Sequence, residues 1–550
     1  MGEQVWGWLL PPSVRGHSIP YGISVILCGL LLLGFSPNAL AQYMGAPSVF
    51  RAPSSSSSSP ASSAPNADVD AGTVPSGGLQ GVSWLFTPSI SISETYNDNV
   101  DLAPPGQARS DLITAVTPSL NVVGQTARAN VAFTYNPQLL LFALGTSSPV
   151  VQQQLLGTGK IEVYPEMLFV DGSASISQAY ISNTGPIAAT TLTTNNNLQT
   201  VEAVNFSPYL VHHYGSYADG QTRYSYGLVA AGAGGIGTQT TNELSSVTKS
   251  GDYFGPLNWT LTTSYTRVDG LSATTGVVGG SARTDALSVV DASYPIYDRV
   301  SATGSLGYQS IKDPTLTTNQ VGLIWNVGLR YDPSPFASVS ASYGHRNGGT
   351  DYAFSARYDL GAQTHLNASY TQTVETTQSL IAANLNGLVV GPGGVLINPK
   401  TGLPVVPGNN PFGPGVVPFS ITNGSFLDKR FQLDASATRG RNTYSLLAYA
   451  DQQSEQVNAA NERAIGGSFT WSRQLWPRLT SNFSATYANI GFLDGSGRND
   501  NYYSASASLV YTLARDATAQ ISFVRSDRVS SQTQNNLVDD LITFSVQKRF

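Results

Sequence analysis

The sequence predicts an all-β fold, a transmembrane antiparallel up-and-down β-barrel of about 22 strands, within a range of roughly 18 to 24. Three observations predict it: only 11% of the 550 residues are charged, side chains alternate with period two, and connections alternate between short and long. An ordinary soluble domain carries about 25% charged residues. Disordered chains lack the aromatic residues that make up 10% of this one. The net charge of −6 excludes the basic surface of a nucleic-acid-binding protein.

The first 41 residues are predicted to be an export signal. An apolar run over 23–35 is followed by Ala39-Leu40-Ala41, so we expect cleavage between Ala41 and Gln42. At about 1.5 Å per residue the run spans roughly 20 Å, less than the ~30 Å hydrocarbon core of a bilayer. Cys28, the one cysteine of the chain, lies in this run. The cleaved chain would therefore hold no disulfide and no thiolate metal site.

Residues 42–81 form the next predicted region. They are rich in Ser, Pro, Ala and Gly and include six consecutive serines at 54–59. This composition is typical of a flexible linker, and we expect a periplasmic tether. A tether that threads into the pore as a crude plug is the alternative. The barrel itself is expected over 82–550.

Period-two alternation begins after the tether. Val321, Trp325 and Leu329 lie on one phase of a strand, and Asn326 and Arg330 lie on the other. The same alternation recurs over 479–487 and 503–511. Because successive side chains of a strand point to opposite faces, this pattern indicates one face toward lipid and one toward a polar lumen.

The connections between the predicted strands alternate in length. Short turns are expected near 124–126, 165–166, 214–216, 251–255, 295–298, 332–335, 361–362, 439–442, 474–477 and 513–516. Longer loops are expected near 97–109, 181–199, 269–282, 379–424, 491–499 and 528–536. Short periplasmic turns and long extracellular loops are typical of barrels in the outer membrane of Gram-negative bacteria. We therefore expect that location.

The carboxyl-terminal strand has the length of a membrane span. The ten residues that lead from 540 to 550 rise roughly 25 Å at about 3.3 Å each when tilted, which matches the apolar band of such barrels. Its alternate apolar residues resemble the signal that the barrel-assembly machinery recognises, namely Ile542, Phe544, Val546 and Phe550. Lys548 departs from that pattern at one position.

A search for chemistry finds no catalytic constellation, so no enzyme, cofactor or metal site is predicted. His212 and His213 are adjacent on a strand and face opposite ways, so they cannot share a metal ion. His345 is expected to face outward. Asp98 and Asp101 in the first long loop could offer oxygen ligands to calcium, although solvated loop acids are commoner and no EF-hand spacing is present.

The predicted lumen face carries mostly Ser, Thr, Asn and Gln. Scattered titratable residues on this face are candidates for contact with a solute: Asp219, Arg223, Arg299, Arg330, Arg357, Asp359 and His365. An ion-selective pore would show dense rings of one sign. The mixed lumen therefore favours a neutral or weakly charged saccharide, although any water-filled barrel needs polar residues inside.

The loop over 379–424 is long and unusually apolar, with Lys400 as its one charge. Loops of this length without structure of their own are usually functional or disordered. Two hypotheses stay open: the loop folds over or into the barrel as a constriction, or it docks on a neighbouring protein.

Several segments resemble one family of barrels, namely 91–102, 168–178, 324–335, 342–350, 429–443 and the closing Lys548-Arg549-Phe550. They are similar to porin-like outer-membrane proteins associated with PEP-CTERM/exosortase and exopolysaccharide loci. The resemblance implies a conduit or assembly component for exopolysaccharide export, with polysaccharide and periplasmic export proteins as partners. A diffusion or uptake porin for small solutes, and a lipid- or polysaccharide-modifying enzyme, are the alternatives.

Overall fold

The computed structural model describes residues 83–550 apart from 232–236, 272–280, 314, 317–319, 362, 378, 382–388, 391–395, 399–402, 405–419, 423, 455–460 and 494. The predicted signal (1–41) and tether (42–81) lie outside the described residues, as does Lys400. The part of the chain that is described holds no helix long and apolar enough to cross a membrane.

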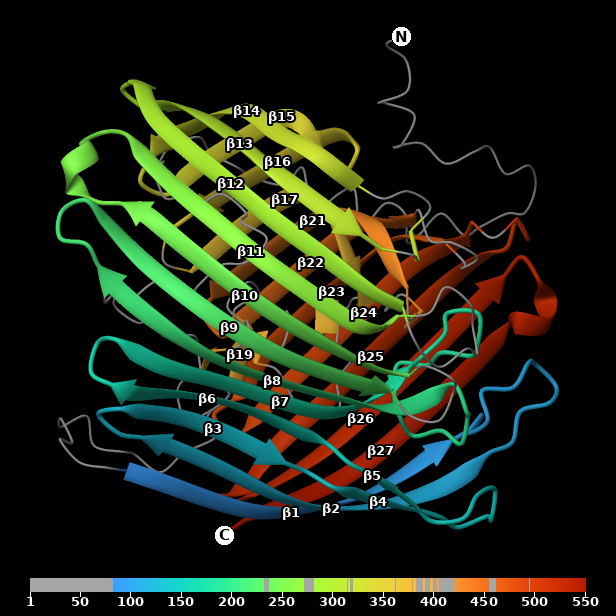
Figure 1. Ribbon diagram of the computed structural model, residues 1–550. Coiled ribbons are helices and arrows are strands. Elements are labelled where there is room, and N and C mark those ends of the chain that lie inside the picture. Colours follow the sequence, from blue (N-terminus) through green and yellow to red (C-terminus); the bar gives the residue numbers. More distant parts are fainter. Residues whose placement is uncertain are drawn as a thin grey trace. The chain divides into compact units, whose positions relative to one another are not determined.

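The described residues form a closed antiparallel barrel of 22 strands, which confirms the predicted fold class and strand number. The sheet has 24 strands because the short hairpin β4–β5 adds to the 22 that close the barrel. Closure is direct, since β1 (Ser83–Asn97) pairs antiparallel with β27 (Leu537–Arg549). Figure 1 shows the inclined strands side by side, with β27 in red returning next to β1 in blue.

Each remaining strand pairs with its neighbours along the chain. The first group is β2 (Asp111–Gln125), β3 (Ala129–Tyr135), β4 (Gln138–Phe142), β5 (Val150–Gln152), β6 (Leu155–Tyr164), β7 (Leu168–Tyr180), β8 (Leu198–His213), β9 (Ala218–Ala231), β10 (Thr238–Ser250), β11 (Asn258–Leu271) and β12 (Ser281–Tyr297). The second is β13 (Val300–Lys312), β14 (Gln320–Ser334), β15 (Ala337–Arg346), β16 (Gly349–Asp359), β17 (Thr364–Thr376), β21 (Ser425–Arg439), β22 (Asn442–Ser454), β23 (Glu462–Trp476), β24 (Leu479–Phe492), β25 (Asn499–Ala514) and β26 (Ala517–Ser530).

Three very short strands form a separate sheet within the long loop: β18 (Val389–Val390), β19 (Leu396–Asn398) and β20 (Leu403–Pro404). Short 3-10 helices occur at Asp252–Phe254 and at Thr533–Asn535.

The predicted alternation of short turns and long loops is present. One connection at the long-loop end departs from it, because β15 and β16 are joined by Asn347-Gly348 alone. Both residues have positive φ angles, 53° and 70°, as a type I′ hairpin turn requires. An Asn-Gly pair between alternating segments is the sequence signal of this turn.

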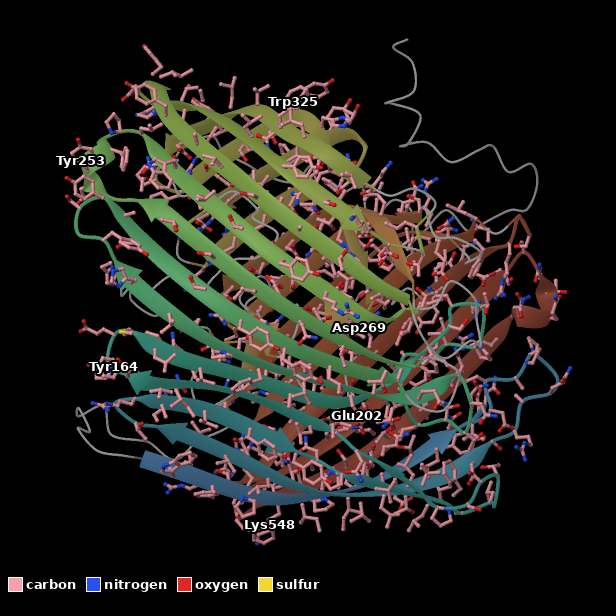
Figure 2. The ribbon with its side chains drawn as sticks, in the orientation of Figure 1. Tyr164, Glu202, Tyr253, Asp269, Trp325 and Lys548 are labelled. Carbon is pink, nitrogen blue, oxygen red and sulfur yellow. The ribbon has the colours of Figure 1, made fainter. Side chains whose placement is uncertain are left out.

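The lipid face of the barrel is apolar. Val321, Val327 and Leu329 are each more than half exposed on the outer phase of β14, and Trp325 lies between them (Figure 2). Figure 2 also shows Tyr164 and Tyr253 at the short-turn end, and Glu202 and Asp269 at the other end. Aromatic and charged groups therefore stand at the levels of the membrane interfaces, as in other outer-membrane barrels.

Candidate functional site

The candidate site is a loop that crosses the mouth of the barrel at the long-loop, extracellular end. Residues 181–197 join β7 to β8, and we call them the mouth loop. Asn183 of the mouth loop hydrogen-bonds to Glu462 on β23. Even by the shorter way round the barrel, eight strands lie between β7 and β23, namely β6, β3, β2, β1, β27, β26, β25 and β24. The mouth loop therefore spans the lumen instead of standing above the rim.

Asn197 holds the two ends of the mouth loop together. Its Oδ1 accepts the Ser182 backbone N–H at 3.0 Å, and its Nδ2 donates to the carbonyls of Ser182 and Pro186 at 2.8 Å each. Gly185 passes close to this amide, because a Cβ on Gly185 would lie 2.7 Å from Asn197 Cγ. A residue without a side chain is required there, so the compact shape of the loop depends on both residues.

Three buried charged residues hold the tip of the mouth loop, and we call Arg498, Asp500 and Arg528 the latch. Arg498 Nη2 and Arg528 Nε donate to Asp500 Oδ2 at 2.8 and 3.0 Å. All three are less than 10% exposed. The guanidinium groups also reach the loop backbone: Arg498 Nη1 donates to the Thr184 carbonyl at 3.1 Å, and Arg528 Nη2 donates to the Asn183 carbonyl at 2.6 Å.

A second polar joint links the mouth loop to the end of the long loop. The carboxylate of Glu462, on β23, accepts Asn183 Nδ2 at 2.7 Å and the Ser420 hydroxyl at 2.5 Å. The Asn183 backbone N–H donates to Ser420 Oγ at 2.9 Å, and the Ile421 N–H donates to the Ile181 carbonyl at 2.8 Å. Glu462 is 1% exposed. Two loops from different parts of the chain therefore meet at one buried carboxylate.

Apolar packing supports the centre of the mouth loop. Ile187 and Ala188 are buried in a cluster with lumen-facing residues of β24 and β27, including Ile490 and Leu537. Beside them the Ala189 N–H donates to Ser526 Oγ on β26 at 2.9 Å. The loop thus buries a small apolar surface inside the mouth in addition to its hydrogen bonds.

The far end of the mouth loop rests on the loop between β1 and β2. Thr194 Oγ1 donates to Asp101 Oδ1 at 2.6 Å, and the Thr194 N–H donates to the Val100 carbonyl at 2.9 Å. The Arg109 guanidinium, which donates to the Asp101 carboxylate, holds the pKa of that carboxyl below its ordinary value. Asp101, considered for calcium, is thus engaged by Arg109 and the mouth loop. Among the described residues no group of three metal-ligating side chains could hold a metal ion.

The described ends of the long loop also lie inside the barrel. Ile381 and Ile421 are 2% and 4% exposed and pack with Ala203 of β8 and Val229 of β9. The long loop begins after β17, and seven strands, β10 to β16, lie between β17 and the β9 wall against which Ile381 and Ile421 pack. Most of residues 379–424 fall outside the described residues, so the constriction and docking hypotheses for the whole loop stay predictions.

The lumen candidates take two kinds of position. Asp219 and Arg299 lie at the short-turn rim and are each 58% exposed. Arg223 lies further along β9, whereas Arg330 and Arg357 lie within four residues of the short-turn ends of β14 and β16. Arg223 pairs with Asp171, two strands away on β7, at 3.0 Å. Arg330 and Arg357 each pair with a carboxylate two residues further along the same strand, Asp332 at 2.9 Å and Asp359 at 2.5 Å.

His365 and Asp359 come together across β16 and β17, with His365 Nδ1 2.7 Å from Asp359 Oδ1. Strand register creates this contact, and the sequence alone did not reveal the partner. Sequence reasoning also missed lumen-facing pairs higher on the wall: Arg283–Asp285 at 3.2 Å and Arg430–Asp451 at 2.5 Å. Opposite charges on the same phase of neighbouring strands are the signal that could have found Arg430–Asp451. The role of every candidate in solute contact stays a prediction.

The predicted assembly-signal residues lie on the lipid phase of the closing strand. Ile542 and Phe544 are 54% and 53% exposed there, and Phe550 is 71% exposed. Val546 shares their phase at 37%. Their recognition by the assembly machinery stays a prediction.

Fold and surface together define the class of protein: a β-barrel of the Gram-negative outer membrane. No family model and no curated protein matches the chain. Similar solved structures include the FrpB iron transporter of Neisseria meningitidis (TM-score 0.46, 11% identity, 84% of this chain and 82% of that one). Others are the ferric-catecholate import receptor Fiu of E. coli (0.45, 11%, 84% and 81%) and the siderophore receptor PirA of Acinetobacter baumannii (0.44, 9%, 84% and 80%).

These comparisons overturn the predicted role in exopolysaccharide export. The three solved barrels are named as an iron transporter, a ferric-catecholate import receptor and a siderophore receptor, and none of these names describes an export conduit. The same finding counts against the two alternatives, a diffusion or uptake porin for small solutes and a lipid- or polysaccharide-modifying enzyme.

Proposed function

We propose that this protein is a gated outer-membrane uptake transporter for a polar solute, with the mouth loop as its gate. The observation that carries the proposal is the position of residues 181–197, which bridge distant walls of the barrel from inside the mouth. The closure stands on the extracellular side, so a solute that arrives from outside meets it first.

The hydrogen bonds that hold the mouth loop can break and re-form while the barrel stays folded. Arg498 and Arg528 donate hydrogen bonds to loop carbonyls, and Glu462 accepts one from the Asn183 side-chain amide. The strand pairing of β7 with β8 is complete from Leu168 to Tyr180 and does not depend on the loop. Displacement of the loop would therefore cost its local contacts alone, which suits a lid that opens and closes.

The lumen below the gate supports a polar cargo. Serine hydroxyls meet across strands at Ser484–Ser506 (2.7 Å) and Ser340–Ser355 (3.1 Å), and the charged groups are largely paired. A water-filled passage with such walls favours hydrated polar solutes. The resemblance to proteins of PEP-CTERM/exosortase loci adds no cargo to this proposal. We also propose that the barrel-assembly machinery recognises the closing strand, β27, when it inserts this protein into the outer membrane.

Single-channel conductance in a planar bilayer tests the gate. The variant replaces residues 183–195 by a short Gly-Ser linker, and the matched control replaces residues 531–536, a loop of the same rim that joins β26 to β27. We expect low conductance in the unmodified protein and in the control, and a large increase in the variant. Equal conductance in all three proteins would contradict the proposal.

A further inference from the structure

The latch carries more positive than negative charge. Arg498 and Arg528 share one carboxylate, Asp500, although both guanidinium groups are more than nine-tenths buried. Two other buried carboxylates lie in this region. Glu462 accepts the Asn183 amide and the Ser420 hydroxyl. Asp539 lies opposite Ser526 on β27, and its carboxylate oxygens bond to neither guanidinium. A buried group with an uncompensated charge is costly unless something offsets it.

Neutral carbonyl groups take the remaining donors. Arg528 directs Nη2 to the Asn183 carbonyl and Nη1 to the Gly185 carbonyl, and Arg498 Nη1 donates to the Thr184 carbonyl. Hydrogen bonds from a guanidinium to an anionic oxygen are roughly twice as strong as those between neutral groups, and carboxylate and phosphate fit its fork with two bonds. An anion would therefore satisfy these donors better than the loop does.

The guanidinium of Arg498 is also held in place. Its Cζ lies 4.8 Å from the ring centre of Phe492, and two of its nitrogens contact Asp500. A donor group fixed before a ligand arrives loses little conformational entropy on binding. The two guanidinium groups thus form a preorganised pair that the tip of the mouth loop covers.

We propose that Arg498 and Arg528 bind an anionic oxygen group, a carboxylate or a phosphate, of the transported solute, and that residues 183–185 occupy this site in the closed state. This inference rests on the proposed gate and names its trigger. When the loop opens transiently, the anion binds the exposed guanidinium groups, and the open state gains population by the difference in affinity. The solute class is therefore anionic.

Two measurements test the inference with matched probes. D-glucose, D-glucuronate and D-glucose 6-phosphate differ mainly in having no anion, a carboxylate or a phosphate. In planar bilayers we expect glucuronate or glucose 6-phosphate to raise the open fraction of the protein by about tenfold, and glucose to leave it unchanged. By calorimetry in detergent, the active anion should bind the variant that lacks residues 183–195 about tenfold more tightly than the unmodified protein, because the competing carbonyls are gone.

Three substitutions, two at Arg498 and one at Arg525, separate the effect of the site from that of general charge. Arg498→Gln should abolish the response to the anion, and Arg498→Lys should weaken it, which guards against a variant that fails to fold. Arg525→Gln is the control, because Arg525 is 47% exposed on the outer phase of β26, where it pairs with Asp540 at 2.6 Å. It should leave the response unchanged.

The outcomes distinguish the inference from the gate. If removal of residues 183–195 raises conductance but neither anion binds better than glucose, the anion site is wrong and the gate stands. An equal loss of response in Arg498→Gln and Arg525→Gln would also overturn the site. If removal of the loop leaves conductance unchanged, the proposed function itself is wrong.

Discussion

Replacement of Asp500 by Asn should release the mouth loop. Asp500 is fully buried, and it is the carboxylate that both guanidinium groups of the latch contact. In the closed state the substitution leaves Arg498 and Arg528 buried beside each other without the carboxylate that both of them contact. In the open state water solvates both groups. The change therefore weakens closure more than it weakens the barrel.

The size of this effect follows from buried ion pairs. Removal of one partner from such a pair costs about 3 to 5 kcal/mol. At 1.36 kcal/mol for each factor of ten, this corresponds to an increase of roughly two to nearly four orders of magnitude in the population of the open loop. Backbone amides of the loop report that population directly, since the Ala189 N–H is bonded to Ser526 Oγ and the Asn183 N–H to Ser420 Oγ when the loop is closed.

Hydrogen–deuterium exchange read by mass spectrometry, on peptides that cover residues 183–189, is the assay. Asp540→Asn is the matched control, because Asp540 pairs with the exposed Arg525 at 2.6 Å, and exposed pairs contribute about 0 to 1 kcal/mol. We expect Asp500→Asn to accelerate exchange in these peptides by at least about a hundredfold, and Asp540→Asn to leave them nearly unchanged. Similar exchange in both variants would refute the argument that the latch holds the loop.

Three further predictions concern the barrel and the loop. Val327→Arg on the lipid phase should reduce the stability of the protein folded in vesicles by about 2 to 4 kcal/mol, and Asn326→Arg on the lumen phase should reduce it by much less. Urea titrations measure both changes, and equal losses of stability would contradict the assigned faces. Asn197→Ala removes three hydrogen bonds worth about 1 kcal/mol each, so exchange of the loop amides should rise at least about tenfold, and unchanged protection would refute this. The pKa of Asp101 is lowered from 3.8, so its bond to the loop stabilises closure above about pH 4 and is lost as pH falls through the lowered pKa. Arg109→Gln should move this loosening to higher pH, and an unshifted exchange profile would count against it.

The barrel could be predicted because its determinants are local. The alternation over 321–331 assigns each side chain to lipid or lumen without knowledge of the neighbouring strands, and β14 spans these residues with Val327 exposed and Asn326 on the opposite phase. The same phase placed Asp359 and His365 on one face. Their contact at 2.7 Å needed the register of β16 against β17, which the sequence pattern does not specify.

The gate could not be predicted because its determinants are distant in the chain. Arg528 meets the Asn183 carbonyl across 345 positions, and Asn183 meets Glu462 across 279. Residues 181–197 are an ordinary polar loop by composition, and nothing in that composition distinguishes a loop that folds inward from one that projects outward. The segments that carry the family resemblance include Val100 and Asp101, which contact the mouth loop, but they include neither Glu462 nor any residue of the latch.

A reversible crosslink of the mouth loop tests the central claim most directly. Ala189 and Ser526 lie in contact, with the Ala189 N–H 2.9 Å from Ser526 Oγ, so Ala189→Cys with Ser526→Cys would place two thiols within reach of a disulfide between the loop and β26. Single-channel conductance of this double variant should be lower and free of openings under oxidising conditions, and openings should return on reduction. Openings that persist at the same rate with the disulfide formed would contradict the claim that residues 181–197 gate the barrel.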